Sequence, residues 1–393
     1  MRRTRESHDR RPATVDEFGR SSYHRRSLLK LLSTNGENSI VFTAADFKAI
    51  VSGQRSGIGA ALARCALRAA ETPYAAAMLW RNCRYDRGAA EVHRVEVPVI
   101  SVGNLTLGGT GKTPMVAWLA RWFRNQGVRV CLISRGYKTT DGARNDEAME
   151  LEQRLPDVPH LQNPDRVAAA RIAIDELDTQ LILLDDGFQH RRLHRDLDIV
   201  LLDALEPFGH EHVFPRGMLR EPIRGLRRAD VICLTRADAV SDSARQALAD
   251  RIIRLASGVT YCEAVSNPSG LLNSTGRQRP VQSLQGQSVL AFCGIGNPAG
   301  FRHTLESAGL DVLQLREFAD HHHYDRNDLR RMADWAASYP SATAIICTHK
   351  DLVKISLNAL GKLPLYALEI QQDFIRGRGE LESHLNSFTG AIE

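Results

Sequence analysis

The chain has 393 residues, enough for two domains and a large core, and its 43% hydrophobic and 25% charged residues are typical of a soluble globular protein. A formal net charge of +5 is small for this length, and aromatic residues at 6% are too sparse for a surface that stacks nucleobases, so we expect no nucleic-acid partner. The seven cysteines never occur as a CxxC pair, which disfavours a zinc site or a disulfide framework and indicates reduced thiols in the cytoplasm.

Residues 1–45 are polar and irregular, and we expect them to be disordered. Their arginines are a feature of mitochondrial presequences, but the acidic residues among them argue against that interpretation. We expect neither a secretory signal peptide nor a membrane-spanning helix, because the apolar stretches are too short.

We expect residues 46–94 to form a helical segment rich in arginine. One helix is expected over 57–70, and Thr72-Pro73 has the pattern of an N-cap and first turn of a second helix. The second helix would end in a cluster of basic residues, namely Arg81, Arg84 and Arg87. A basic amphipathic helix can lie on an anionic membrane surface, and the alternative is a helix packed against the main domain. The sequence leaves both open.

The stretch over residues 95–123 has the pattern of a strand, a glycine-rich loop and a helix. The strand is expected over 97–102, where β-branched residues dominate. Glycines let the loop backbone turn sharply and approach a ligand, and the free N–H groups at a helix start attract anions. The predicted phosphate loop and its nucleotide contacts comprise Thr106, Leu107, Gly108, Gly109, Thr110, Gly111, Lys112 and Thr113.

Within this loop, Lys112 is expected to contact the outer phosphates of a nucleotide, and the Thr113 hydroxyl is expected to ligate Mg²⁺. The match to GxxxxGK[ST] is imperfect, because Thr106 stands where the first glycine belongs. A glycine-rich turn that only packs a helix on a sheet is the alternative. The strand before the loop and the helix after it favour the phosphate loop.

From residue 95 onward, strand and helix patterns alternate, which predicts an α/β fold. We expect a P-loop NTPase-like parallel sheet flanked by helices, with a second, smaller α/β lobe and an N-terminal amphipathic helical segment. The expected strands are 97–102, 129–134, 181–186, 198–203, 231–235, 259–265, 288–293, 311–318, 343–348 and 365–370, and the expected helices include 113–125, 165–176, 241–256, 298–308 and 325–338. The expected division is a kinase core over 95–265, a connection rich in Ser, Gly, Gln and Pro over 266–287, and the smaller lobe over 288–393.

Two carboxylates end the predicted strand at 181–186. Because Asp185 and Asp186 follow an apolar run, we expect them at the carboxyl edge of the sheet, where the nucleotide sites of such folds lie. One is expected to hold Mg²⁺ and the other to orient or activate a hydroxyl. Gln189 and the basic residues after it would meet phosphates. An isolated pair of aspartates more often ends a strand as solvated charge, but the phosphate loop favours the functional interpretation.

Further polar segments have weaker patterns. Asp146 and Glu147 follow a strand and are suited to act as a base or a metal ligand. The two histidines of GHEHVFPRGMLREP offer too few ligands for zinc, so we expect a substrate-facing loop there. Asp320 precedes three histidines, a pattern of surface polarity or of an imidazole beside a general base. CTHKDLVK lacks the spacing of the guanine-reading [NT]KxD motif, so we reject guanine specificity.

Taken together, these motifs resemble the tetraacyldisaccharide 4′-kinase family, the lipid A kinases of Gram-negative bacteria. In chain order they are VPVISVGNLTLGGTGKTP, SRGY, NDE, DDGFQHRRLHRDLDIVLLDA, FPRGMLREP, GNP–F, FADHH and THKDLVK. The resemblance implies ATP- and Mg²⁺-dependent phosphorylation of the 4′-hydroxyl of tetraacyldisaccharide 1-phosphate to form lipid IVA. It also implies a peripheral enzyme on the cytoplasmic face of the inner membrane, whose partners are this lipid-linked disaccharide and an anionic lipid surface, and we expect a monomer.

The resemblance also implies roles for single residues. Asp146 takes the position of the base that acts on the sugar hydroxyl, assisted by His321. Asp185 and Asp186 match the acidic pair near Mg²⁺ and nucleotide, with Glu147 expected among the metal ligands. Gln189 and His190 match the residues beyond the acidic pair, and Gln189 is expected to contact the nucleotide.

Three features depart from the family pattern. The usual GDEP is replaced by Asn145-Asp146-Glu147-Ala148. Three histidines follow Asp320, so the choice of His321 depends on its place directly after that residue. Residues 1–45 have no counterpart.

Without the resemblance, the residues support only an ATP-dependent P-loop kinase or ATPase. A nucleotide-gated switch or partitioning ATPase would use the same loop but would need no acceptor base, so Asp146 and His321 discriminate between the two. A small-molecule or nucleoside kinase would not need a basic amphipathic N-terminal segment.

Overall fold

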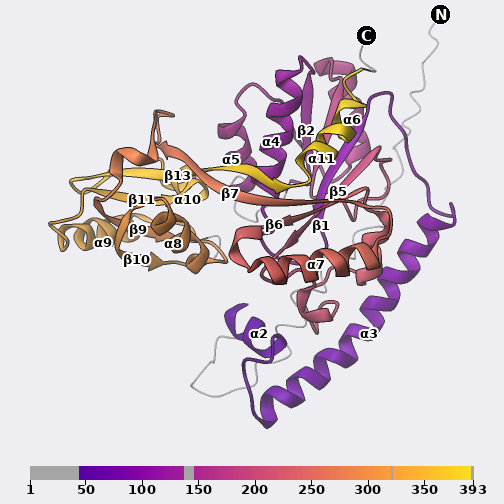
Figure 1. The fold of residues 1–393 in the computed structure, drawn as a ribbon, viewed down its shortest axis with the longest axis horizontal. Coiled ribbons are helices and arrows are strands. Elements are labelled where there is room, and N and C mark those ends of the chain that lie inside the picture. The colour runs from indigo at the N-terminus through magenta and orange to yellow at the C-terminus, as the bar shows by residue number, and fades with distance from the viewer. Residues whose placement is uncertain (1–43, 137–145, 320–321, 391–393) are drawn as a thin grey trace, which may run out of the picture. The chain divides into compact units, whose positions relative to one another are not determined.

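The computed structural model of the chain describes residues 44–136, 146–319 and 322–390. Helix α2 lies in a separate compact unit, residues 1–54, and all other elements lie in the unit of residues 55–393 (Figure 1). The predicted disorder of residues 1–45 falls, apart from the first residues of α2, outside the described part of the chain.

The elements, with their bounds, are α2 (Ala44–Val51), α3 (Ile58–Asp86), β1 (Val99–Asn104), α4 (Lys112–Asn125), β2 (Val130–Ser134), α5 (Asp146–Arg154), β3 (His160–Gln162), α6 (Arg166–Leu177), β4 (Leu181–Asp185), β5 (Leu197–Asp203), β6 (Val231–Thr235), α7 (Asp242–Leu255), β7 (Thr260–Leu272), β8 (Gln278–Arg279), β9 (Ser288–Cys293), α8 (Pro298–Ser307), β10 (Asp311–Glu317), α9 (Arg326–Ala337), β11 (Ala344–Thr348), α10 (His349–Ile355), β12 (Ala359–Leu360), β13 (Leu363–Arg376) and α11 (Arg378–Asn386), with short 3₁₀ turns between some of them.

The strands form one sheet in the order β10-β9-β11-β13-β7-β6-β5-β1-β4-β2-β3, with β8 and β12 paired to β7 and β13. Strands on either side of the β7–β13 pair run parallel to their neighbours, whereas β7 and β13 are antiparallel to each other. Figure 1 shows these two long strands side by side between the two parallel halves of the sheet. The predicted α/β fold with a mostly parallel sheet is confirmed, and each of the ten expected strands is present.

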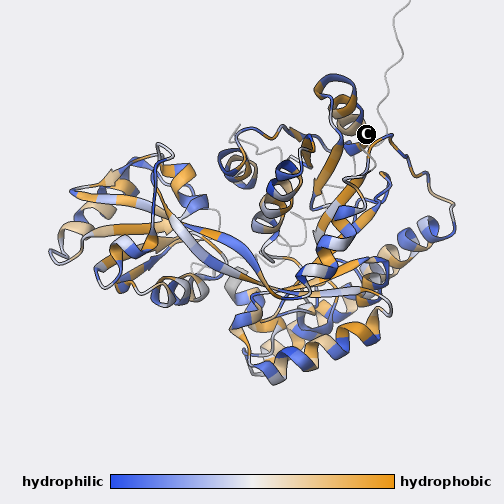
Figure 2. Cartoon of the chain, turned by 45° about the horizontal axis from the view of Figure 1, so that its top comes forward, coloured by the Kyte–Doolittle hydropathy of each residue, from blue (hydrophilic) through white to orange (hydrophobic). Residues whose placement is uncertain are grey.

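Helices cover both faces of the sheet because successive strand residues point to opposite faces. In β1, Ile100 and Val102 pack with α4, α5 and α11, while Val99 packs with α6 on the other side. The α4 side chains at Met115, Val116, Leu119 and Phe123 are fully buried, as the helical spacing of its apolar residues requires. The helices carry both hydrophobic and hydrophilic residues, which is typical of elements that shield a sheet from water (Figure 2).

The connection expected over 266–287 begins later than predicted, because β7 continues to Leu272. Strand β7 pairs with β13 from Glu263 to Leu272, and Leu271 is buried in the core. Pro268 lacks an N–H, but the β7–β13 register shifts beside it, which lets a proline stay in the strand. Helices α5, α10 and α11 and the short strand β3 were not predicted.

The expected break at Thr72-Pro73 is wrong, because α3 is one helix from Ile58 to Asp86 with Pro73 inside it. A proline inside a helix removes one hydrogen bond and costs about 3 kcal/mol, so other contacts must hold the helix together. Glu71 accepts a hydrogen bond from the Val213 N–H at 2.8 Å, and Tyr74 donates one to the Arg220 carbonyl at 3.2 Å. These tertiary contacts hold the chain on both sides of the proline.

The chain returns at its C-terminal end to the half of the sheet that carries β1. Leu381 and Leu385 of α11 are fully buried in the same core cluster as α4 and β1. The last residues of the segment expected as the smaller lobe therefore pack with the segment expected as the kinase core. Among the described residues, none of the helices has the length and apolar content needed to cross a membrane.

Candidate active site

The glycine-rich loop connects β1 to α4 as the sequence predicts, and α4 begins at Lys112. Gly108 and Gly111 have φ angles of +119° and +81°, which a residue with a side chain rarely adopts. A Cβ atom at Gly108 or Gly109 would have nothing within 4 Å, so the space above the loop is open to a ligand. The N–H groups at the start of α4 adjoin this space, and this arrangement suits phosphate.

The second acidic residue, Asp186, lies beside the loop. Its carboxylate oxygen is 3.7 Å from the Lys112 Nζ, and both of its oxygens accept hydrogen bonds from the Arg220 Nη1 at 2.8 Å. Burial alone would raise the pKa of Asp186, but Lys112, Arg220 and Arg166 outweigh it and hold that pKa below its usual range. Asp186 is therefore an ionised carboxylate between two cations.

The first acidic residue, Asp185, has the opposite environment. It ends β4, is buried, and its Oδ1 accepts no hydrogen bond from any residue that the structure describes. The pKa of Asp185 is raised to about 7, mainly by burial; Lys112 opposes the rise, and the neighbouring carboxylates of Asp186 and Glu147 contribute to it. A buried carboxylate oxygen without a donor is a position at which a cation can be held.

Gln189 joins the loop after β4 to the end of β1. Its Nε2 donates to the Asn104 carbonyl at 2.9 Å and to the Glu221 carboxylate at 3.2 Å. Its Oε1 faces the Arg220 Nη1 at 3.4 Å. Gln189 thus lies within the set of side chains around Asp186, where the sequence predicted a nucleotide contact.

His190 follows and remains neutral at physiological pH. Burial, followed by repulsion from the nearby Arg166, Arg195 and Arg192, lowers its pKa to about 4. Its Nδ1 lies 3.4 Å from the Arg166 Nη1. A neutral imidazole at this place accepts or donates a hydrogen bond and carries no net charge toward phosphates.

Helix α5 begins at Asp146, whose side chain lies outside the described part of the structure, as do Asp320 and His321. The influence of Glu147 on the pKa of Asp185 shows that the start of α5 is near the acidic pair. The described residues thus bring together the phosphate loop, Asp185, Asp186, Gln189 and Glu147. The pairing of Asp146 with His321 stays a prediction.

The loop of residues 209–222 lies against the phosphate loop. The Leu107 N–H donates to the Met218 carbonyl at 2.7 Å, and the Arg220 Nε donates to the Thr106 carbonyl at 3.1 Å. Its histidines lie beside different carboxylates, His210 beside Glu206 at 2.7 Å and His212 beside Glu71 at 3.1 Å. Within the described ranges no cluster of metal-ligating side chains is found, and none forms around these histidines.

Sequence reasoning assigned no role to Arg166 and only a general one to Arg220 and Glu221. Arg166 opens α6 and is buried beside His190, whereas Arg220 and Glu221 reach the site from a loop more than thirty residues further along the chain. The sequence feature that could have indicated these roles is the motif FPRGMLREP, in which a basic and an acidic residue, Arg220 and Glu221, are adjacent. Its partners become visible only in the fold.

Comparison with known proteins gives a consistent result. Residues 63–389 match the protein family described as LpxK, tetraacyldisaccharide-1-P 4′-kinase. A tetraacyldisaccharide 4′-kinase of Anaeromyxobacter sp. (strain K) is 38% identical over 357 residues, which cover 86% of this chain and 94% of the relative. The enzyme of that name from Geobacter sulfurreducens is 35% identical over 343 residues, which cover 83% and 94%. LpxK from Aquifex aeolicus, crystallised in complex with ATP, matches with a TM-score of 0.66 at 29% identity, over 83% of this chain and 99% of that one.

Proposed function

The chain belongs to the tetraacyldisaccharide-1-P 4′-kinase family, and we propose that it transfers the γ-phosphoryl group of ATP to the 4′-hydroxyl of tetraacyldisaccharide 1-phosphate, forming lipid IVA in lipid A biosynthesis. The observation that carries the proposal is the position of the Lys112 Nζ, 3.7 Å from Asp186, at the meeting point of the phosphate loop and the end of β4. In this place Lys112 can offset charge on the transferred group while the loop N–H groups bind the other phosphates.

We assign Mg²⁺ to Asp185 and Thr113, with Glu147 close by. The buried Oδ1 of Asp185, which has no hydrogen-bond donor among the described residues, supports this assignment, and carboxylate and hydroxyl oxygens are the ligands that Mg²⁺ prefers. When bound, the ion would neutralise charge on the nucleotide phosphates. Both oxygens of Asp186 are occupied by Arg220, so we assign Asp186 to fixing the two cations that face the phosphates.

Asp146 is proposed as the base that removes the proton of the sugar hydroxyl, with His321 as its partner. The proximity of Glu147, the next residue of α5, to the acidic pair supports this role for Asp146. An acceptor base distinguishes a kinase from a nucleotide-gated switch or a partitioning ATPase, which transfers the phosphoryl group to water.

The membrane surface is proposed as the place of the reaction, since the acceptor carries acyl chains. Helix α3 leaves large apolar side chains in water, with Ile58 82% exposed and Leu62 and Trp80 each 65% exposed. Arg84 lies over the Trp80 ring at 5.2 Å, so a cation accompanies the aromatic side chain, as in helices that bind anionic interfaces. We propose a monomer bound peripherally to the cytoplasmic face of the inner membrane, without a nucleic-acid partner.

The direct test is ³²P transfer from ATP to tetraacyldisaccharide 1-phosphate in detergent micelles. We expect the product to be phosphorylated at the 4′ position, and we expect Lys112→Ala to lower kcat by roughly 10²–10³, the magnitude for loss of one transition-state charge contact. Lys362→Ala, at an exposed turn after β12, is the matched control and should keep the parental rate.

Three results would contradict the proposal. Near-parental turnover in a folded Lys112→Ala protein would exclude this loop as the ATP site. ATP hydrolysis without transfer to the lipid would favour the switch or ATPase, and transfer to a nucleoside but not to the lipid would favour a small-molecule kinase.

A further inference from the structure

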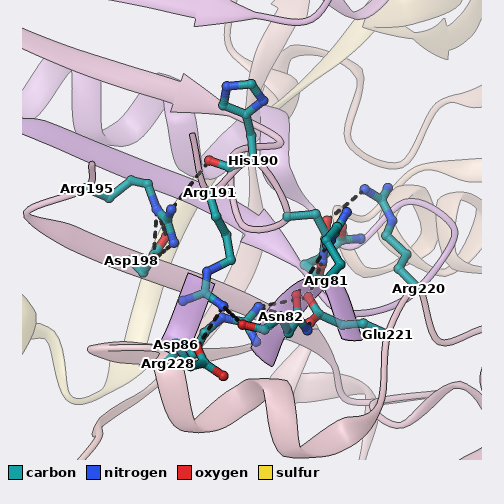
Figure 3. Close-up of polar contacts among 12 residues, drawn as sticks. Arg81, Asn82, Asp86, His190, Arg191, Arg195, Asp198, Arg220, Glu221 and Arg228 are labelled. Atoms are coloured by element: carbon teal, nitrogen blue, oxygen red, sulfur yellow. Dashed lines mark hydrogen bonds and ion pairs between the residues drawn. The ribbon is translucent and has the colours of Figure 1, made fainter. Parts of the chain in front are cut away.

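Glu221 is a fully buried carboxylate in the loop beside the phosphate site, and the hydrogen bonds that it makes with described residues all come from N–H donors. Its Oε2 accepts from the Asn82 Nδ2 at 2.5 Å (Figure 3), and its Oε1 accepts from the Gln189 Nε2 at 3.2 Å. The Arg228 Nη2 lies 2.9 and 3.0 Å from the two oxygens and supplies the compensating charge. The three donors come from α3, from the loop after β4 and from the turn at 223–228, so Glu221 joins segments far apart in the sequence.

A carboxylate can only accept hydrogen bonds, and this property fixes the orientation of the two amides. Gln189 must direct its NH₂ group toward Glu221, where the same nitrogen also reaches the Asn104 carbonyl at 2.9 Å. Its oxygen is thereby directed to the other side, 3.4 Å from the Arg220 Nη1. A neutral residue in place of Glu221 would remove one of the two acceptors that hold the Gln189 NH₂ group in this direction, the other being the Asn104 carbonyl.

The orientation of Gln189 matters because of what Arg220 does. The same Nη1 binds both oxygens of Asp186, which in turn lies beside Lys112. With its oxygen toward Arg220, Gln189 provides an acceptor for the Arg220 guanidinium. If its NH₂ group pointed there instead, the N–H donors of Gln189 and Arg220 would face each other without an acceptor. Because Glu221 can only accept hydrogen bonds, it directs the Gln189 oxygen toward Arg220. Through this one amide, Glu221 influences Arg220 and Lys112, the cations that face the phosphates.

On its other side Glu221 holds the end of α3. Asn82 is buried in a helix whose other residues are mostly partly or fully exposed. A second contact lies beside it, where the Arg191 Nη1 donates to the Asn82 carbonyl at 3.1 Å and pairs with Asp86 at 2.8 Å. Figure 3 shows Asn82 between Glu221 and Arg191. The end of α3 and the loop after β4 are therefore fastened to each other at two points.

We propose that Glu221 is a positioning residue for phosphoryl transfer: its buried carboxylate fixes the direction of the Gln189 amide at the phosphate site and ties that amide to Asn82 of α3. The inference rests on the proposed kinase function, because it concerns the rate of that reaction. Glu221 itself touches neither Lys112 nor Asp186 in the contacts above, and it acts through Gln189.

The test is a set of variants in the ³²P-transfer assay with the full chain. Glu221→Gln keeps the shape of the side chain but adds an NH₂ group against the donors, and we expect kcat to fall by about 10- to 100-fold, as for small displacements of reacting groups. The KM for ATP should change by less than about three-fold, because the phosphate loop is untouched. In a Gln189→Ala background, Glu221→Gln should have no further effect on kcat, because its route to the site is already removed.

A reciprocal exchange separates positioning from mere stability. Asn82→Asp alone sets two carboxylates against each other and should lower kcat. In Glu221→Gln/Asn82→Asp, the new amide donates to the carboxylate introduced in α3, and its oxygen accepts from Gln189 and Arg228 as Oε1 does in the parental chain. The kcat should therefore return to within about three-fold of the parental value. Glu263→Gln, at a buried carboxylate of β7 paired with Arg245 at 3.1 Å, is the matched control: it should change the thermal midpoint and leave kcat unchanged.

The outcomes are distinguishable. If the parental chain transfers no phosphate to the disaccharide, the proposed function fails and this inference fails with it. If the parental chain is active, then a parental kcat for Glu221→Gln, multiplied losses in the combination with Gln189→Ala, or no recovery in the exchanged pair would overturn the inference alone. Thermal midpoints recorded for every variant show whether a loss of kcat occurs in folded protein.

Discussion

At the scale of single residues, the site contains two identical side chains whose environments shift their pKa values in opposite directions. Asp185 and Asp186 are neighbours in sequence, yet burial raises the pKa of one to about 7 and cations lower that of the other. The difference follows from the backbone, because Asp186 has a φ of +56° and its side chain turns toward Arg220 and Lys112. Asp185 stays at the end of β4 with an oxygen that has no donor among the described residues.

Another titratable residue, His160 in β3, makes stability depend on pH. Its Nε2 contacts the Ser134 Oγ at 2.9 Å, and burial lowers its pKa to about 4, below the ordinary 6.5 of the unfolded chain. The unfolded state therefore binds the proton more readily, so this contribution to stability is complete above pH 6.5 and is lost as the pH falls toward 4. We expect the free energy of unfolding to decrease over this range by on the order of 1–3 kcal/mol on account of His160.

Urea unfolding of the parental chain and of His160→Gln at pH 7.5, 5.5 and 4.5 measures this contribution. The variant should lose less stability than the parental chain between pH 7.5 and 4.5. His303→Gln, at an exposed position of α8, is the control and should follow the parental chain. Parallel pH profiles for the parental chain and His160→Gln would refute the assignment.

At the scale of elements, α3 combines a buried attachment with an exposed apolar surface. Glu71, Tyr74 and Asn82 bind the rest of the molecule. Between and before them, Ile58, Leu62 and Trp80 lie in water. The two interpretations left open by the sequence, a packed helix and a membrane helix, are thus compatible in one element, because different sides of the helix serve each role.

The membrane role of α3 predicts salt-dependent binding to vesicles. The parental chain should bind vesicles that contain an anionic lipid, and binding should weaken from 0.05 to 0.5 M NaCl, because the Debye length falls below about 10 Å over this range. Leu62→Ser with Ile58→Ser should weaken binding by about ten-fold or more at constant salt, since each apolar side chain that enters the interface contributes of the order of 1 kcal/mol or more.

The control for vesicle binding is Leu177→Ser, which removes a leucine of α6 with 38% of its surface exposed. It should bind as the parental chain does. Co-sedimentation gives the bound fraction. Binding that ignores salt, lipid charge and both α3 substitutions would argue that the exposed face of α3 has another partner.

At the scale of the whole molecule, α5 links the two parallel halves of the sheet. The Arg154 Nη1 donates to the Ile370 carbonyl of β13 at 3.1 Å, and its Nε binds Glu150 at 2.9 Å. Burial alone would raise the pKa of Glu150, but Arg154 and His349 of α10 bring it down to about 2. The helix that begins at Asp146 is therefore held against elements from the C-terminal half. The position of Asp146, at the start of α5, therefore depends on these contacts with the C-terminal half of the sheet.

This link gives the proposed pair of Asp146 and His321 a testable form. Both single alanine variants should lose about 10²-fold or more of kcat, because a sugar hydroxyl is a poor nucleophile without a base, while ATP affinity should be largely kept. If the two act as one unit across the halves of the sheet, the double variant should be little worse than the poorer single variant.

Turnover and nucleotide affinity for the two singles and the double decide this prediction. His323→Ala, at an exposed position in the same run of histidines, is the control and should remain active. Full activity in either single variant, or strictly multiplicative losses in the double, would remove the pair. The division of the chain into a core of 95–265 and a lobe of 288–393 remains a prediction.

The sequence by itself determined the features that short segments encode. Apolar runs of strand length predicted ten strands, and glycines between a strand and a helix predicted the phosphate loop with Lys112 at the start of α4. Asp185 and Asp186 were expected at the same edge because parallel strands deliver their carboxyl ends there, and Asp186 lies 3.7 Å from Lys112 of this loop. These inferences succeed because the pattern of side chains along a few residues sets backbone conformation and burial.

Only the tertiary structure decided which distant residues meet. It makes α3 continuous through Pro73, because contacts with residues 213 and 220 support the helix where local pattern predicts a break. It extends β7 through Pro268, because β13 supplies a partner strand. It also gives Asp185 and Asp186 opposite pKa shifts and surrounds Glu221 with donors from three segments. Such outcomes depend on neighbours that fold into contact from far along the chain, and no local pattern of residues specifies them.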